Sequence, residues 1–279
     1  ALKAQKEWEK VGIEKKSQIV IKIGDELIAK SKELGELLSR EEGKPLAEGI
    51  GEVARAGQQF QYYGSECLRL YGERIPSTRP GFQVEISREP LGVIGIISPW
   101  NFPIAIPAWK AAPAMMCGNA VILKPASLTP ASAIELTKII ANQDIPDGLF
   151  NLVLGSGGDI GNKIATHKDI VAISFTGSVD VGRKLYQDAS PFLKKMQMEM
   201  GSKNPLVVME DADLKTAIAC AANGAYGGTG QKCTASSRLI VHENLYDDFV
   251  KGLIDNIKNL KVGHALDEGT QMGPASNEA

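Results

Sequence analysis

The sequence has no excess of charge of either sign and no long apolar run. Its 279 residues contain 31 Lys and Arg against 33 Asp and Glu. Without surplus positive charge, the chain has little to attract a nucleic-acid backbone or an anionic membrane. The longest apolar stretch, LGVIGIIS, is too short to span a bilayer, and the opening ALKAQKEWEKVGIEKK has no continuous apolar core. We therefore expect a cytoplasmic protein with neither nucleic acid nor membrane as a partner.

Cysteine and histidine are few and widely spaced. The four cysteines, Cys67, Cys117, Cys220 and Cys233, include no CxxC pair, and the three histidines lie near none of them in sequence. Because zinc sites usually combine these residues at short spacings, the sequence predicts no metal site. In a chain of this size with no signal segment, we expect reduced thiols, each by default a small buried side chain.

Helical and strand patterns alternate along most of the chain. Apolar spacing predicts helices across residues 2–75, a half-exposed strand at 82–86 and a buried strand at 92–98. Further on we expect helices at 104–117, 131–141 and 160–165, and strands at 120–123, 150–154 and 170–175. This alternation is typical of an α/β fold with a parallel sheet covered on both faces, whose ligands bind at the carboxyl ends of the strands.

Two strand-to-helix turns are candidates for phosphate binding. The loop GSGGDIG misses the G-x-G-x-x-G spacing by one residue and is weak evidence alone. In ISFTGSVDVGRKL, a buried strand runs through Gly177 and Ser178 into a helix whose free amides and dipole favour a pyrophosphate. On spacing alone, an ordinary turn with a serine cap is the better interpretation.

The segment MQMEM alternates methionines, the last of them Met200, with Gln197 and Glu199. This pattern predicts a strand with apolar side chains on one face and Glu199 on the other, near the strand end. Partial burial would raise the pKa of Glu199 toward the range of a general base. A solvated carboxylate beside Lys203 is an equally good interpretation.

Two further residues are candidates for covalent chemistry. Cys233 lies in YGGTGQKCTASSR, where glycines let the backbone approach a ligand and Lys232 would favour the thiolate. Asn101 lies in SPWNFP, an irregular segment after an apolar strand. Its amide would donate to a developing oxyanion or satisfy loop carbonyls. The patterns alone leave a structural role open for both.

In this order, SPWNFP, ILKPAS, FTGS, MEMGSKNP and GQKC resemble the aldehyde dehydrogenase superfamily. The segments EEGKPLAE, IPDGLFNLVLG and LDEGTQMGP extend the resemblance over essentially the whole chain. Within the superfamily, PWNFPIAIPAWK and TGQKCTASSRLIV look most like bacterial alpha-ketoglutaric semialdehyde dehydrogenases, with succinate-semialdehyde dehydrogenases as near relatives.

The resemblance implies an oxidoreductase that converts a small aliphatic semialdehyde to its carboxylic acid with NAD(P)⁺. Alpha-ketoglutaric semialdehyde is favoured as the substrate, and succinic semialdehyde is the alternative. By position, Cys233 would attack the aldehyde, and Asn101 with the Cys233 amide would hold the thiohemiacetal oxyanion. Glu199 would activate the water that hydrolyses the thioester. Lys110 matches a family lysine near the site, although a solvated helix lysine is a comparable interpretation.

The resemblance also implies a set of cofactor-contacting residues, namely Trp100, Lys124, Gly177, Ser178 and Met200. Lys124 would reach the adenosine ribose, and Gly177 and Ser178 the pyrophosphate. Ser127 stands where NAD-specific relatives often carry Glu, which would repel a 2′-phosphate. Because Ser removes that repulsion and can donate a hydrogen bond, we expect NADP to be favoured, with NAD also accepted.

The architecture implied by the resemblance has three parts. A Rossmann-type coenzyme domain covers residues 1–71 and 99–201, an oligomerisation hairpin covers 72–98, and 202–279 begin a second α/β catalytic domain. The family's opening segment and most of its catalytic domain have no counterpart, so we expect a fragment lacking both termini that leaves apolar surface exposed. A homodimer or homotetramer is expected of the full-length protein. Ser202 replaces a glycine that is usual in the family.

Three rival functions follow from the same residues. A coenzyme-A-acylating relative would resolve the thioester with a thiol, and Glu199 argues against it. A truncated, non-catalytic binding or structural relative is disfavoured by the presence of Cys233, Glu199 and Asn101 together. A cysteine peptidase needs a histidine base, and none of the three histidines has supporting context.

Overall fold

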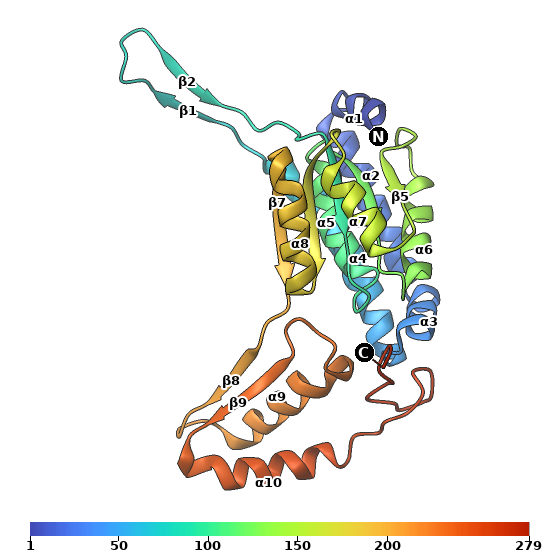
Figure 1. The fold of residues 1–279 in the computed structure, drawn as a ribbon, viewed down its shortest axis with the longest axis vertical. Coiled ribbons are helices and arrows are strands. Elements are labelled where there is room, and N and C mark those ends of the chain that lie inside the picture. Colours follow the sequence, from blue (N-terminus) through green and yellow to red (C-terminus); the bar gives the residue numbers. More distant parts are fainter. Residues whose placement is uncertain (279) are drawn as a thin grey trace.

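The structure, a computed structural model, describes residues 1–278, so the last residue of the predicted 202–279 segment lies outside it. Figure 1 shows a large α/β lobe, a two-stranded arm that projects from one end, and a smaller lobe at the other. The parallel sheet of the large lobe confirms the predicted fold class. No helix of residues 1–278 is both long and apolar enough to cross a membrane.

The chain opens with four helices, as predicted: α1 (Leu2–Glu9), α2 (Ile13–Ala29), α3 (Ser31–Glu42) and α4 (Leu46–Glu66). A short η1 (Cys67–Arg69) ends this helical part earlier than predicted, because the chain then enters the arm. Helices α2 and α4 pack with their backbones in contact. A Cβ atom on Gly24 would lie 2.5 Å from the carbonyl oxygen of Gly57, so glycine permits this approach.

The arm consists of β1 (Glu73–Pro76) and β2 (Gln83–Ile86), paired antiparallel. The strand predicted as half-exposed is exposed on both faces, since no other part of the described chain covers it. The predicted hairpin range 72–98 is too long at its carboxyl end. Residues 93–97 are hydrogen bonded between two strands of the central sheet and belong to the large lobe.

The central sheet has five parallel strands in the order β5-β4-β3-β6-β7. Their bounds are β3 (Val93–Ile97), β4 (Ala120–Lys124), β5 (Phe150–Leu152), β6 (Ile170–Gly177) and β7 (Lys195–Met200). The helices along this part are α5 (Ala105–Met116), α6 (Pro130–Ala141), α7 (Gly157–Thr166) and α8 (Val179–Ala189), followed by η2 (Ser190–Phe192). The chain leaves β3 toward β4 on one side and returns to β6 on the other. Sheets of this kind bind ligands at such a reversal, which here lies at the carboxyl ends of β3 and β6.

Close packing fixes β3 at the centre of the lobe. Gly95 in β3 has no room for a side chain, since an added Cβ would lie 2.4 Å from Cγ2 of Ile164 in α7. On the other side, the fully buried Trp8 donates from Nε1 to the carbonyl oxygen of Met115, at 2.7 Å, and so joins α1 to α5. The loop that leaves β3 therefore starts from a rigid position.

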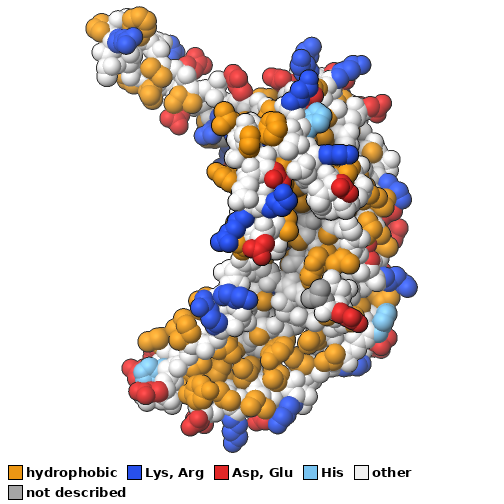
Figure 2. Space-filling model, in the orientation of Figure 1, with side chains coloured by type: hydrophobic (Ala, Val, Ile, Leu, Met, Phe, Trp, Pro, Cys, Tyr) orange, Lys and Arg blue, Asp and Glu red, His pale blue; other side chains and the backbone are white. Residues whose placement is uncertain are grey.

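The smaller lobe is built from β8 (Asn204–Val208), α9 (Leu214–Tyr226), η3 (Gly227–Gly230), β9 (Ser236–Val241), η4 (Glu243–Leu245) and α10 (Tyr246–Ile257). Strands β8 and β9 pair in parallel. Val208, Ala221 and Phe249 form its small cluster of buried apolar residues. Figure 2 shows hydrophobic side chains gathered over the surface of this lobe, and Val207 and Ile240 are more than half exposed. Apolar surface is thus exposed here, as the sequence predicted.

After α10, the chain returns to the large lobe. The amide of Leu46 donates to the carbonyl oxygen of Ala265, at 3.0 Å. The hydroxyl of Ser276 donates to the carbonyl oxygen of Glu42, at 2.8 Å. The chain therefore passes between the two lobes twice, first through the connection from β7 to β8 and again through this returning segment (Figure 1).

Candidate functional site

Most of the predicted site residues lie at one edge of the central sheet. Trp100 and Asn101 follow β3, Lys124 ends β4, Gly177 and Ser178 end β6 and begin α8, and Glu199 and Met200 end β7. Carboxyl ends of parallel strands share an edge, so the fold gathers these side chains although up to 100 residues separate them in sequence. Lys110 comes from α5, and Cys233 comes from the smaller lobe.

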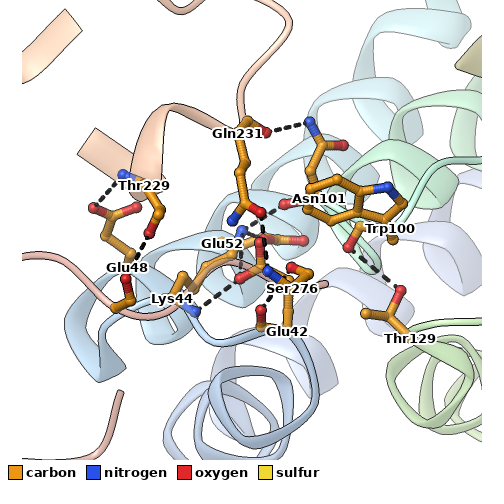
Figure 3. A network of polar contacts seen from close by, with 12 residues as sticks. Glu42, Lys44, Glu48, Glu52, Trp100, Asn101, Thr129, Thr229, Gln231 and Ser276 are labelled. Atoms are coloured by element: carbon orange, nitrogen blue, oxygen red, sulfur yellow. Dashed lines mark hydrogen bonds and ion pairs between the residues drawn. The ribbon is translucent and has the colours of Figure 1, made fainter. Parts of the chain in front are cut away.

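Asn101 joins the two lobes (Figure 3). Its Nδ2 donates to the carbonyl oxygen of Gln231, at 2.7 Å, and Gln231 lies two residues before Cys233. This bond uses one of the two hydrogens on the amide nitrogen. The Oδ1 atom of Asn101 is buried and has no hydrogen-bond partner among the described residues. The predicted oxyanion residue is therefore fixed beside the loop that carries the predicted nucleophile.

The backbone of Asn101 is held by residues for which the sequence predicted no role. The ammonium of Lys44 lies 2.6 Å from the carbonyl oxygen of Asn101 and 2.7 Å from Oε2 of Glu52. One residue earlier, the carbonyl oxygen of Trp100 accepts a hydrogen bond from the hydroxyl of Thr129, at 3.3 Å. Lys44 lies in EEGKPLAE, which entered the sequence analysis only as a family match, because nothing in its local pattern indicates a buried charge.

Cys233 is exposed and is held through its backbone. The side-chain amide of Asn204, the first residue of β8, donates to the carbonyl oxygens of Cys233 at 2.7 Å and of Ala235 at 3.1 Å. Asn204 follows Glu199 by five residues, so one short segment connects the predicted base to the predicted nucleophile. Asn204 was not identified from the sequence, since an asparagine before proline predicts only a turn.

The loop before Cys233 is strained and pinned to α4. Thr229 has a left-handed backbone with φ of 60°, unusual for a β-branched residue, and its hydroxyl donates to the carbonyl oxygen of Gly273. Glu48 accepts the amide of Gly228 at 3.1 Å and lies 3.7 Å from the ammonium of Lys232. Lys232 was predicted to favour the thiolate of Cys233, but its ammonium pairs with Glu48 instead.

Two of the other three cysteines differ from the expectation that each is buried. Cys67 alone of the four is buried, and burial raises its pKa to about 12. Cys117 and Cys220 are exposed.

In residues 1–278, no three His, Cys, Asp or Glu side chains cluster closely enough to hold a metal ion.

Glu199 is exposed, which agrees with the interpretation of a solvated carboxylate and not with that of a partly buried one. The predicted alternation is also present, since Met196 and Met198 pack on the core while Gln197 and Glu199 face outward.

A polar chain connects Glu199 to Lys110. The side-chain nitrogen of Gln197, Nε2, donates to the carboxylate of Glu199 at 3.2 Å. The Oε1 atom of the same side chain accepts from the ammonium of Lys110 at 2.8 Å. The same ammonium donates to the hydroxyl of Ser174, at 2.8 Å. Burial lowers the pKa of Lys110 to about 8, although the charge of Glu199 acts to raise it. The interpretation of Lys110 as a solvated helix lysine is therefore wrong.

The predicted cofactor residues on β4 and the following loop lie close to the Gly-rich loop. Lys124 is buried, and its ammonium donates to the carbonyl oxygen of Pro125, at 2.9 Å. Burial lowers the pKa of Lys124, and no carboxylate pairs with it in residues 1–278. Ser127 is exposed and donates to the carbonyl oxygen of Gly155, at 3.3 Å.

The turn from β6 to α8 is closely packed. Ser178 caps α8 by accepting the amide of Val181, as the ordinary-turn interpretation predicted. A Cβ atom on Gly177 would lie 2.5 Å from the ring of Phe175, and one on Gly182 would lie 2.6 Å from the sulfur of Met200. The two glycines thus let Phe175 and Met200 pack against the turn, and the dipole at the start of α8 favours an anion there.

The chain is therefore an α/β protein with a Rossmann-type parallel sheet whose strand order reverses between β3 and β6. The capped helix α8 begins at that reversal, and the cysteine loop of the smaller lobe is hydrogen bonded to the loop after β3. The chain belongs to the aldehyde dehydrogenase family, whose sequence profile matches residues 1–279.

Individual relatives give the same result. The chain is 41% identical over 279 residues to the alpha-ketoglutarate semialdehyde dehydrogenase of Haloferax volcanii, covering all of this chain and 58% of that protein. The succinate-semialdehyde dehydrogenase structure from Burkholderia pseudomallei superimposes with a TM-score of 0.98 at 35% identity, over 100% of this chain and 58% of the other. The structure of a point mutant of betaine aldehyde dehydrogenase from Staphylococcus aureus, solved with NAD⁺, superimposes with a TM-score of 0.97 at 32% identity. The superposition covers 100% of this chain and 57% of the other. The chain thus spans less than two thirds of these relatives.

Proposed function

We propose that the full-length protein containing this chain is an NAD(P)-dependent aldehyde dehydrogenase with Cys233 as its nucleophile. The observation that carries this proposal is the hydrogen bond from Asn101 to Gln231, which fixes an amide donor beside the cysteine loop at the carboxyl edge of the sheet. The family membership and the exposed thiol support it further.

In the proposed reaction, the thiolate of Cys233 attacks the aldehyde carbon and forms a thiohemiacetal. Its oxyanion accepts hydrogen bonds from the amides of Asn101 and of the Cys233 backbone. NAD(P)⁺ supplies a hydride acceptor when it is bound. Glu199 then takes a proton from the water that attacks the resulting thioester, and the carbon–sulfur bond breaks to release the acid and the thiol. Lys110 acts on Glu199 through Gln197 and holds the carboxylate in place.

For the cofactor, we propose that α8 binds the pyrophosphate at Gly177 and Ser178, and that Lys124 reaches the ribose. Trp100 and Met200 line the same site. An exposed Ser127 at the edge of the Gly-rich loop leaves room for a 2′-phosphate, so NADP is favoured over NAD.

For the substrate, we propose a semialdehyde with a distal carboxylate, alpha-ketoglutaric semialdehyde first and succinic semialdehyde second. A cavity of about 380 Å³ is lined by Phe102 and Trp109 and also by charged side chains, namely Lys44, Glu48, Glu52, Arg55 and Lys232. Lys44 pairs with Glu52 and Lys232 with Glu48. Arg55 forms no ion pair in residues 1–278, so an anionic group in this cavity would meet an available guanidinium.

The test is an absorbance assay of cofactor reduction with the full-length protein and its Cys233→Ala variant. We expect cysteine-dependent reduction that is faster with the two semialdehydes than with betaine aldehyde, and an Arg55→Met variant that raises KM only for the carboxylate-bearing substrates. Reduction that survives in Cys233→Ala would contradict the nucleophile, and a rate that requires coenzyme A would favour the acylating rival. A preference for betaine aldehyde would overturn the substrate proposal and leave the rest intact.

A further inference from the structure

Lys44 is a buried cation placed directly behind the site (Figure 3). Its side chain is 4% exposed. The ammonium contacts Glu52 at 2.7 Å and the carbonyl oxygen of Asn101 at 2.6 Å, and it lies 4.2 Å from the ring centre of Phe102. A charge at this depth is stable only with such partners, so its position is fixed by them.

Glu52 fixes the other end of the same segment. Its Oε2 atom binds Lys44, and its Oε1 atom accepts the backbone amides of Ile104 and Ala105, each at 3.1 Å. These two amides belong to the start of α5, where backbone donors have no partner within the helix. One carboxylate from α4 therefore ties both ends of residues 101–105.

The side chain of Asn101 faces the cysteine loop, so a fixed Asn101 backbone also fixes the contact with that loop. The carbonyl oxygen of Gln231 accepts from the Asn101 side chain at 2.7 Å, and the side chain of Gln231 accepts the amide of Ser276 at 3.0 Å. Displacement of the Asn101 backbone would move its amide relative to Cys233. Donors to an oxyanion act only over a narrow range of positions.

We propose that Lys44 and Glu52 are positioning residues that set the place of the Asn101 amide, an inference that rests on the proposed dehydrogenase function. Both side chains also line the cavity proposed for the substrate, but their polar atoms bind each other and the backbone of residues 101–105. The effect of the pair on kcat therefore passes through that backbone to Asn101.

That dependence gives a test that separates positioning from a general loss of structure. In the full-length protein, Lys44→Met is measured alone and combined with Asn101→Ala, with cofactor affinity as the check on folding. We expect Lys44→Met to lower kcat by about tenfold or more with cofactor affinity unchanged, and to lower it by less than about twofold when Asn101 is already Ala. Lys15→Met is the matched control, because Lys15 pairs with Asp144 at the exposed surface, and it should leave kcat unchanged.

Removing one member of a buried ion pair can prevent folding. A second variant, which changes both members, is therefore measured in the same way. Lys44→Met with Glu52→Gln removes both charges of the closest pair, and the glutamine oxygen can still accept the amides of Ile104 and Ala105. Glu42, which lies 3.9 Å from the Lys44 ammonium, keeps its hydrogen bond from the backbone amide of residue 44. We expect this double variant to fold and to show the same dependence on Asn101. An equal loss of kcat with and without Asn101, or a folded double variant with wild-type kcat, would overturn the proposal. An inactive but folded wild-type protein would instead refute the proposed function.

Discussion

The side chain of Asn101 and the backbone of Gln231 are separated by 130 residues in sequence and by 2.7 Å in space. This hydrogen bond crosses from the loop after β3 to the loop that carries Cys233. It is the direct polar link between the sheet edge and the cysteine, and it comes from a residue whose own backbone is fixed by Lys44. The geometry of the proposed reaction therefore depends on how firmly this contact is maintained.

Cofactor preference should change when a charge is placed at residue 127. In the full-length protein, Ser127→Glu should raise KM for NADP by about tenfold or more, since a carboxylate would repel the 2′-phosphate, with a smaller change for NAD. Steady-state kinetics with both cofactors measure this. Ser127→Gln, similar in size but uncharged, is the control. A Ser127→Glu enzyme that keeps its preference for NADP would contradict the proposed role.

The pKa of Lys110 should be measurable and should respond to Glu199. The ¹³Cε chemical shift of Lys110 in lysine-labelled protein should titrate with a midpoint of about 8, because burial disfavours the charged amine. Glu199→Gln should move the midpoint lower, since the carboxylate now acts to raise this pKa. Lys110→Arg identifies the resonance. A midpoint at the ordinary value of lysine would contradict the buried position.

Glu42 should make the stability of the chain depend on pH. Burial raises its pKa to about 7, with Glu52 and Glu48 adding to the shift and Lys44 opposing it. A raised folded-state pKa stabilises the fold below the unfolded value of 4.5, and this contribution is lost as pH rises toward 7.

Urea unfolding of wild type and Glu42→Gln between these pH values measures the effect. Relative to the variant, the wild-type free energy of unfolding should fall by up to about 3 kcal/mol as pH rises. Glutamine keeps an acceptor for the Lys44 amide, which the carboxylate binds at 2.8 Å. Parallel pH curves for the two proteins would show that Glu42 titrates normally.

Close packing between β3 and α7 should make Gly95 intolerant of a side chain. Gly95→Ala should destabilise the chain by about 1–3 kcal/mol, because its Cβ would overlap the buried Ile164. Gly161→Ala in α7 is the matched control. No atom lies within 4 Å of its added Cβ, and alanine is favoured over glycine in a helix by about 0.5–1 kcal/mol. Equal urea midpoints for the two variants would contradict the packing.

The parts of the molecule that the sequence predicted well are those with strong local patterns. β3 and the first four residues of β4 are continuous apolar runs, and their burial follows from that composition. The alternation around Glu199 was also predicted correctly, because a strand period of two needs no knowledge of neighbours. The same pattern left the burial of Glu199 open, since burial depends on what covers the strand.

The residues that hold the site in place could not be predicted from local sequence patterns. Nothing near Lys44 in sequence indicates that it reaches Asn101, 57 residues further along the chain. The same holds for Asn204, which reaches the backbone of Cys233 from 29 residues away. Such contacts depend on how α4, β3 and the smaller lobe are arranged in space. The identity of a single side chain does not reveal that arrangement.

The hydrogen bonds between the lobes limit how Cys233 can move. The smaller lobe and the returning segment are held at Glu42 in α3, at Glu48 in α4 and at Asn101 after β3, through Ser276, Gly228 and Gln231 respectively. Because these three contacts come from three different elements of the large lobe, a rotation about any one of them would break the other two. The cysteine loop can therefore leave the sheet edge only when several bonds break together, as in a cooperative local unfolding step.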